Sequence, residues 1–225
     1  MPASRLVVFD LDGTLVDSIG DIAAAVKEAL AEVAPRARPL EDREIRGFVG
    51  DGARVLVTRA LAAAGIDRRV EDVLPVYLDA YRRRLLDTTT FYPGALETLD
   101  ALADRTLCVL TNKPGDLSRV LIEGLGATRR FARIWGGGDV PAPKPDPAGL
   151  LRLLSETGTQ PEDAAMVGDS PIDVATGRAA GVFTVGATFG MDPRGVVDAR
   201  PDEVIADLRD LKQILRAGEG VPARR

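Results

Sequence analysis

The sequence of 225 residues contains no histidine and a single cysteine. Without histidine, catalysis by Ser-His-Asp or Cys-His groups, phosphoryl transfer through imidazole and histidine-ligated zinc sites are all excluded. Cys108 cannot form an internal disulfide, and the sixth residue after it is Pro114 rather than the arginine of a thiolate phosphate loop. An enzyme built from this chain must therefore rely on carboxylates and other oxygen groups, which prefer a hard cation such as Mg²⁺.

Basic charge and long apolar runs are also scarce. The net charge of −5 gives no reason to expect a nucleic-acid partner. Near the N-terminus only the short run Leu6–Phe9 is apolar, too short for a signal peptide or a membrane span, so we expect a cytoplasmic protein without membrane contacts. Lysine is rare among the 29 basic residues, at Lys27, Lys113, Lys144 and Lys212. Each lysine is therefore a candidate for a specific role.

What is present predicts an α/β fold. Short apolar runs rich in β-forming residues alternate with helical periodicity, the pattern of a Rossmann-like parallel sheet wrapped by helices. The strand candidates are Leu6–Phe9, Thr106–Leu110, Arg133–Trp135, Ala164–Val167, Val182–Val185 and, more weakly, Glu203–Ile205. The long interval between the first two strands exceeds what one crossover needs, which indicates an inserted subdomain.

The inserted segment is predicted to be all-helical. Apolar residues at helical spacing predict helices over Ile19–Ala34, Leu40–Phe48, Ala53–Ala64 and Val70–Leu85. We therefore expect a catalytic core formed by residues 1–15 and 91–216, a helical cap formed by residues 16–90, and a disordered tail over residues 217–225.

Two carboxylates follow the first predicted strand. Asp10 and Asp12 are two residues apart, so their side chains leave an extended segment on the same side. Open α/β sheets bind ligands at the carboxyl ends of their strands, where this pair lies. Because adjacent bare carboxylates repel, the pair indicates a cation or a proton between them. The alternative is an acidic turn after a strand.

Polar residues also follow or precede the later elements. Thr111 and Asn112 close the second strand with donors suited to phosphate oxygens, although turns use both residues freely. Asp146 and Pro147 are explained as the N-cap and first residue of a helix, which leaves Lys144 unexplained. We expect Lys144 to neutralise a phosphate or a buried carboxylate.

A further acidic pair runs from a strand into a helix. Ser170, Pro171 and Asp173 fit an N-cap, a first-turn proline and a capping-box acid, so Asp173 has a purely structural interpretation as well as a functional one. Asp169 precedes this cap at a strand end, and capping does not account for it. We interpret Asp169 as a metal ligand.

Taken together, these residues resemble the haloacid dehalogenase-like hydrolase superfamily. Its four motifs are matched in order by Asp10-Leu11-Asp12-Gly13-Thr14, Thr111, Lys144 and Gly168-Asp169-Ser170-Pro171-Ile172-Asp173. The resemblance spans about Leu6 to Gly186 and includes a helical cap between the first two motifs. It implies a Mg²⁺-dependent phosphoric monoester hydrolase acting on a small phosphorylated metabolite.

The resemblance also assigns roles. Asp10 would be the nucleophile that forms an aspartyl phosphate, and Asp12 would protonate the leaving oxygen and then activate water. Mg²⁺ would be held by the Asp10 carboxylate, the Asp12 main-chain carbonyl and Asp169, with Asp173 supporting these ligands. The phosphoryl group would be bound by Thr111, Asn112 and Lys144.

The cap resembles that of phosphoglycolate phosphatases, which hydrolyse 2-phosphoglycolate to glycolate and phosphate. The similarity lies in the segment from Arg46 to Leu61, although nucleotidases and pyrophosphatases share parts of it. Gly50 and Gly52 would let a tight turn approach a small substrate, with helix-start amides facing an anion. The candidates to pair with a substrate carboxylate are Arg46, Arg54 and Arg59, each of which is alternatively a solvated charge.

Other functions remain open at this stage. Asp12 argues against a dehalogenase, because a halide leaving group needs no proton. A phosphonate hydrolase would use a cap lysine, and the sole cap lysine, Lys27, is interpreted as a solvated helix charge. Within the superfamily, nucleoside monophosphates, pyrophosphate and sugar phosphates are alternative substrates. A phospho-aspartate signalling receiver and a catalytically silent binding protein are alternatives of other classes. Whether the protein is a monomer or a homodimer stays open.

Overall fold

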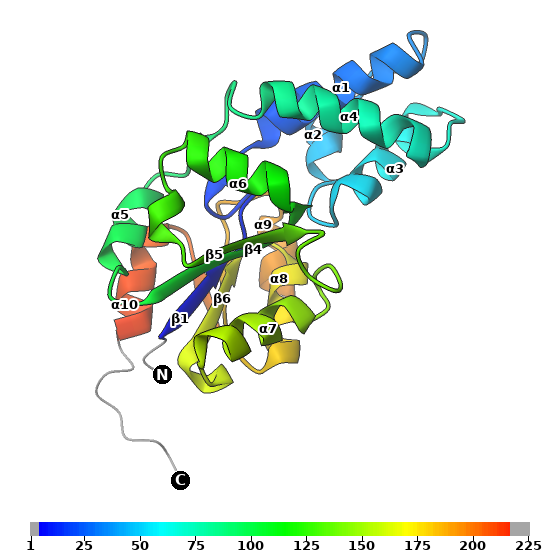
Figure 1. Ribbon diagram of the computed structural model, residues 1–225. Coiled ribbons are helices and arrows are strands. Elements are labelled where there is room, and N and C mark those ends of the chain that lie inside the picture. Colours follow the sequence, from blue (N-terminus) through cyan, green and yellow to red (C-terminus); the bar gives the residue numbers. More distant parts are fainter. Residues whose placement is uncertain (1–4, 217–225) are drawn as a thin grey trace.

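A six-stranded parallel sheet forms the centre of the molecule in the computed structural model, which describes residues 5–216 (Figure 1). The strand order is β5-β4-β1-β6-β7-β8, and every neighbouring pair in it is parallel. Helices cover both faces of this sheet. The predicted Rossmann-like α/β fold is thus confirmed.

The elements follow the predicted order closely. The strands are β1 Leu6–Phe9, β2 Val16–Asp17, β3 Thr90–Phe91, β4 Thr106–Pro114, β5 Arg133–Gly137, β6 Ala164–Gly168, β7 Phe183–Ala187 and β8 Glu203–Ile205. The helices are α1 Ile19–Val33, α2 Asp42–Arg46, α3 Ala53–Ala64, α4 Val70–Arg84, α5 Ala95–Ala101, α6 Gly115–Gly124, α7 Ala148–Thr157, α8 Pro171–Ala180, α9 Pro193–Asp198 and α10 Leu211–Arg216. No helix of residues 5–216 is long and apolar enough to cross a membrane.

Strand β1 shows why the sheet lies at the centre. It pairs with β4 on one side and β6 on the other, and all of its side chains are buried. Val7 and Phe9 belong to the apolar cluster that includes residues of α5, α6 and α10, whereas Leu6 and Val8 belong to the cluster formed with α7 and α8. Alternate side chains of one strand therefore anchor the two helical layers.

Helices α1 to α4 form a separate group to one side of the sheet (Figure 1). Within it α4 packs against α1 and α3 through buried apolar residues such as Ile22 and Val73. Helix α2 is shorter than predicted, because Glu41 and Glu44 form a capping box at its start and Gly47 follows its end. The division into core, cap and tail at the predicted boundaries stays a prediction, and residues 217–225 lie outside the described residues.

The two ends of the inserted segment form short strands beside its helices. Val16 and Asp17 pair antiparallel with Phe91 and Thr90 as the strands β2 and β3. Next to this pair, the amide of Tyr92 donates a hydrogen bond of 3.0 Å to the carbonyl of Leu15. The chain therefore leaves the core and returns to it side by side.

Buried Asp21 fastens the cap near this boundary. It lies in the first turn of α1 and accepts hydrogen bonds of 2.6 to 3.1 Å from the amides and hydroxyls of Thr88 and Thr89. Burial favours the neutral carboxyl, but these hydrogen bonds together lower the pKa of Asp21 below its usual value. The first cap helix is thereby tied to the segment that returns to the core.

Strand β4 is longer than the predicted Thr106–Leu110 and runs to Pro114. Its extension pairs with the end of β5, where Pro114 lies opposite Gly137. Polar Thr111, Asn112 and Lys113 therefore belong to a buried strand end, rather than to a loop. This extension brings them to the same sheet edge as Asp10.

Candidate active site

The site lies at the carboxyl end of the central strand. Asp10 directly follows β1, and its amide donates a hydrogen bond of 2.9 Å to the carbonyl of Val167 in β6. Because β4 and β6 lie on opposite sides of β1, the crevice at this edge is the topological switch point at which open α/β sheets bind ligands.

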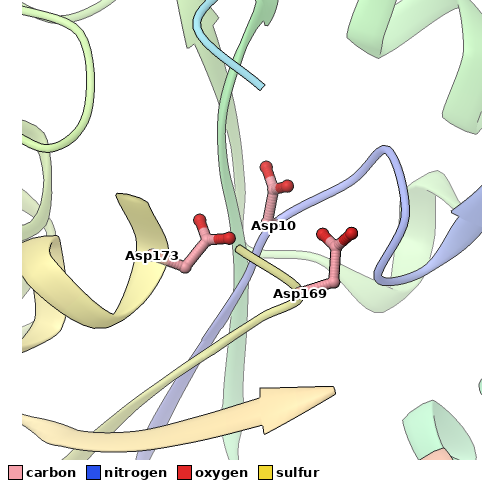
Figure 2. Close-up of side chains that lie close together, drawn as sticks. All are labelled: Asp10, Asp169 and Asp173. Atoms are coloured by element: carbon pink, nitrogen blue, oxygen red, sulfur yellow. The ribbon is translucent and has the colours of Figure 1, made fainter. Parts of the chain in front are cut away.

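Three buried carboxylates converge at this point. Figure 2 shows Asp10 after β1, Asp169 after β6 and Asp173 on α8, with their side chains directed toward a shared space. One oxygen from each lies within 4.8 Å of the others. Asp169 is held by the hydroxyl of Thr14 at 3.0 Å and the amide of Met191 at 2.6 Å. The arrangement is thus a fixed cluster of oxygen donors.

Lys144 provides the positive charge inside this cluster. Its Nζ lies 2.8 Å from Asp10 Oδ1 and 2.6 Å from Asp173 Oδ1, and the side chains of all three residues are almost fully buried. Asn112 holds the main chain of Lys144 by accepting from its amide at 2.8 Å and donating to its carbonyl at 2.9 Å. Asn112, at the end of β4, therefore positions Lys144.

Asp173 combines the two interpretations that the sequence left open. Its Oδ2 accepts hydrogen bonds from the amide and hydroxyl of Ser170, which completes the predicted capping box at the start of α8. Its Oδ1 binds Lys144. Asp173 therefore both caps the N-terminus of α8 and contributes a negative charge to the site. The neighbouring prediction for Asp146 differs by one residue: α7 begins at Ala148, whose amide donates to Asp146 Oδ1.

The cluster carries more negative charge than Lys144 can balance. Burial, opposed by Lys144 and reinforced by Asp173, raises the pKa of Asp10 to about 6. Burial and the neighbouring charges of Asp10 and Asp173 raise the pKa of Asp169 to about 8. For Lys144, burial alone would lower the pKa, but Asp10 and Asp173 raise it above its usual value. A hard divalent cation among these carboxylates would restore the balance, so the donor set fits Mg²⁺.

Asp12 lies in a second arrangement beside the first. Its Oδ1 accepts a hydrogen bond of 2.6 Å from Ser18 and lies 3.0 Å from Nζ of Lys113. Lys113 also donates to the hydroxyl of Tyr81 on cap helix α4, and its ammonium lies 4.3 Å from the centre of that ring. Asp12 is therefore held directly by Ser18 at the start of cap helix α1 and by Lys113 of the core, which in turn contacts Tyr81 of the cap.

The sequence prediction gave no role to Lys113, Tyr81 or Ser18. For Lys113 a signal was present, because lysine is rare in the chain and this one directly follows Thr111 and Asn112. Tyr81 fitted the apolar stripe of its helix, and nothing in that pattern shows where its hydroxyl points.

A tight backbone turn brings the first and last motifs together. Gly13 has a φ of +90°, and a β-carbon at this residue would lie 2.2 Å from Asp169 Oδ2. A side chain here would therefore both strain the backbone and displace the carboxylate.

The cap loop before α3, which includes Gly50 and Gly52, lies against the site. Their φ values are +120° and +88°, and both residues line the pocket that contains Asp10 and Asp12. The carbonyl of Gly50 accepts a hydrogen bond of 3.0 Å from Asn112, and a β-carbon at Gly52 would lie 3.1 Å from the Asn112 carbonyl. This cap loop therefore depends on glycine for its close approach.

The candidate cap arginines are in three different environments. Arg46 donates to the carbonyls of Gly190 and Met191 at 2.5 and 3.2 Å, so it joins the cap to the core loop that holds Asp169. Arg59 pairs with Asp51 at 2.6 Å. Arg46 and Arg59 both line a second pocket, which also includes Asp10, Asp12 and Asp169. Arg54 instead pairs with Glu71 at 2.7 Å, is exposed and lines neither pocket. The structure does not bring Arg54 to the site.

Comparison with known proteins gives consistent matches over most of the chain. The family model for haloacid dehalogenase-like hydrolases matches residues 7–187. A phosphoglycolate phosphatase of Pseudomonas putida is 42% identical over 216 residues, covering 92% of this chain and 78% of that protein. One of Rhodospirillum rubrum is 40% identical and covers 92% of this chain and 89% of that protein.

Solved structures agree with these matches. The crystal structure of a predicted phosphoglycolate phosphatase from Haemophilus somnus superposes with a TM-score of 0.90 at 30% identity, covering 95% of this chain and 99% of that one. The similarity therefore includes the cap as well as the sheet.

Proposed function

We infer the function of this chain from its family and its site: it belongs to the haloacid dehalogenase-like hydrolases, and it is a phosphoric monoester hydrolase. The substrate that we propose is 2-phosphoglycolate, which the curated relatives in Pseudomonas putida and Rhodospirillum rubrum carry in their names. The observation that carries the proposal is the buried Asp10 carboxylate beside Lys144 and two further aspartates at the switch point of the sheet.

The arrangement supports two successive displacements at phosphorus. In the first, an Asp10 oxygen attacks phosphorus, the ester P–O bond breaks, and the leaving alkoxide takes a proton from Asp12. In the second, Asp12 takes a proton from water, whose oxygen attacks phosphorus and releases phosphate from Asp10. Lys144 stabilises negative charge on the transferring group, and the hydroxyl of Thr111, which lines the pocket with Asp10 and Asp12, donates to its oxygens.

We propose that Mg²⁺ is the cofactor, held by Asp10 and Asp169 with the main-chain carbonyl of Asp12. Asp173 supports this set from behind through its contact with Lys144. When bound, the cation neutralises phosphate and carboxylate charge and so lets the anionic groups approach. The excess of buried carboxylates over Lys144 supports this assignment.

The cap supports a small substrate. Gly50 and Gly52 of the cap loop line the pocket that contains Asp10 and Asp12, and Gly52 approaches the main chain of Asn112 so closely that the loop leaves no room for a side chain there. Nucleoside monophosphates, pyrophosphate and sugar phosphates remain the alternatives within the same chemistry. That the enzyme is cytoplasmic and works as a monomer or homodimer is also our prediction.

A phosphate-release assay tests the proposal. The purified protein is assayed with Mg²⁺ against 2-phosphoglycolate, nucleoside monophosphates, sugar phosphates and pyrophosphate. We expect the highest kcat/KM for 2-phosphoglycolate and no release after chelation of the metal. A higher kcat/KM for a nucleotide would contradict the proposed substrate, and phosphorylation without multiple turnovers would contradict the proposed enzyme class.

A further inference from the structure

Two pockets include Asp10 and Asp12, and the one that lies against helix α4 has an unexpected lining. None of the candidate cap arginines lines it, and Lys113 is the one basic residue among the described residues that do. Apolar cap side chains, including Ile22 and Leu56, form much of the rest. An anionic group that entered this pocket would therefore meet a single cation.

The position of Lys113 relative to Asp12 defines what it can reach. Its Nζ lies 3.0 Å from Asp12 Oδ1 and 3.3 Å from Oδ2, and it also donates to the hydroxyl of Tyr81. In the proposed reaction Asp12 delivers a proton to the ester oxygen of the substrate. A group that binds Lys113 must therefore lie close to that ester oxygen.

In a carboxylic acid that is phosphorylated on its α-hydroxyl, the carboxylate lies close to the ester oxygen. Its carboxylate carbon is separated from the ester oxygen by one carbon atom, so an ester oxygen beside Asp12 places the carboxylate within reach of Lys113. The longer contact, between Nζ and Asp12 Oδ2, can be exchanged for the incoming oxygen, because Ser18 holds Oδ1 at 2.6 Å independently.

We propose that Lys113, presented jointly with Tyr81 of the cap, binds the carboxylate of the substrate and thereby selects short phosphorylated acids. This inference deepens the proposed function and rests on it. It replaces the cap arginines in that role, because Arg46 is bound to core carbonyls, Arg59 pairs with Asp51, and Arg54 lies away from the site.

The tyrosines of α4 support a short anionic tail. Tyr77 and Tyr81 stack with their ring centroids 5.7 Å apart, and both line the pocket. The hydroxyl of Tyr81 accepts from Lys113 and keeps its own proton for donation to a second acceptor. A carboxylate therefore meets an ammonium and phenolic donors next to apolar cap side chains such as Leu56.

The test compares two substrates of similar size. Ethyl phosphate carries a methyl group where 2-phosphoglycolate carries its carboxylate. We expect Lys113→Met to lower the ratio of kcat/KM for 2-phosphoglycolate over ethyl phosphate by about 10- to 100-fold, the effect of losing a hydrogen-bonded charge. The ratio cancels any loss at Asp12 that is common to both substrates. Lys113→Arg, which keeps the charge, should retain part of the preference.

Matched controls separate the outcomes. Lys212→Met removes an exposed lysine of α10 and should leave the ratio unchanged. If the wild-type enzyme prefers 2-phosphoglycolate and Lys113→Met keeps that preference, or lowers both rates equally, the inference is overturned while the proposed function stands. A wild-type enzyme without the preference would overturn both.

Circular dichroism establishes that each variant is folded, and Lys113→Gln takes the place of Lys113→Met if the latter is not. Where turnover falls below detection, the two ligands are titrated against Asp10→Asn with and without Lys113→Met. The added substitution should weaken binding of 2-phosphoglycolate at least tenfold more than binding of ethyl phosphate. An equal effect on both ligands would overturn the inference.

Discussion

Two buried lysines stand side by side in this site, but their surroundings differ. Lys144 is held between Asp10 and Asp173, and each of these residues belongs to the core. Lys113 is held between Asp12 of the core and Tyr81 of the cap. The first cluster is complete within the sheet, its adjoining loops and helix α8. The second exists only while the cap is seated on the core.

This difference separates the groups proposed to act on phosphorus from those that meet the leaving part of the substrate, which include the proposed acid and base Asp12. Groups that act on phosphorus must keep their geometry in every state of the enzyme, and the Lys144 cluster has only core partners. Groups that recognise the leaving part of the substrate can be assembled by cap closure, because that part must enter and depart. The two clusters should therefore respond differently to substitution.

The largest expected effect belongs to the Lys144 cluster. Asp10→Asn should lower kcat by about 10⁴-fold or more for every substrate, because it removes the attacking oxygen. Phosphate release under saturating substrate measures this loss, and circular dichroism checks the fold. A loss of kcat that depended on the leaving part of the substrate would contradict the proposed difference between the two clusters. Residual turnover near the wild-type rate would remove Asp10 from its assigned role.

Stability should distinguish the two lysines next. Lys144→Met leaves two buried carboxylates without their cation, so in chelator we expect a loss of about 3–5 kcal/mol in the free energy of unfolding. Lys113→Met leaves one carboxylate, which Ser18 still contacts, so its loss should be smaller. Urea unfolding of both variants measures the two losses in free energy of unfolding. Equal losses would contradict the proposed difference between the two lysine clusters.

Asp21 offers an intermediate effect at the boundary of the cap. Asp21→Asn should cost about 1–3 kcal/mol, because it weakens the hydrogen bonds from Thr88 and Thr89. Since the pKa of Asp21 is lower in the folded protein, its stabilisation is present above the unfolded value and is lost as the pH falls through the lowered one. Urea unfolding should therefore show the difference from wild type at about pH 7 shrinking below about pH 4. A constant difference would contradict this assignment.

The smallest effect concerns the metal. With its pKa raised to about 8, Asp169 makes the metal-free protein less stable as the pH rises from the unfolded value toward about 8. Mg²⁺ should therefore raise Tm more at about pH 9 than at about pH 6. Differential scanning fluorimetry measures this difference, and Asp169→Asn should abolish it. A Mg²⁺ shift that survives Asp169→Asn would place the cation elsewhere.

The residues of the core cluster could be predicted from the sequence, whereas the contacts between cap and core could not. Asp10 and Asp169 were evident because each follows a buried strand, where the parallel topology alone brings them to one edge. The extension of β4 was missed because it consists of polar residues and ends at Pro114, and residues such as asparagine and proline carry little strand signal. The partners of Lys113 and Arg46 depend on how the cap docks on the core, a non-local packing that periodicity does not encode.

The paired strands β2 and β3 have a consequence for how such proteins diversify. Because the two ends of the helical segment run antiparallel beside each other, the chain leaves the core and returns to it at one place, the β2–β3 pair. A domain of another size or architecture could be inserted between these two strands without a change in the strand order of the sheet. The same reaction centre could thereby acquire a new repertoire of molecules without being rebuilt.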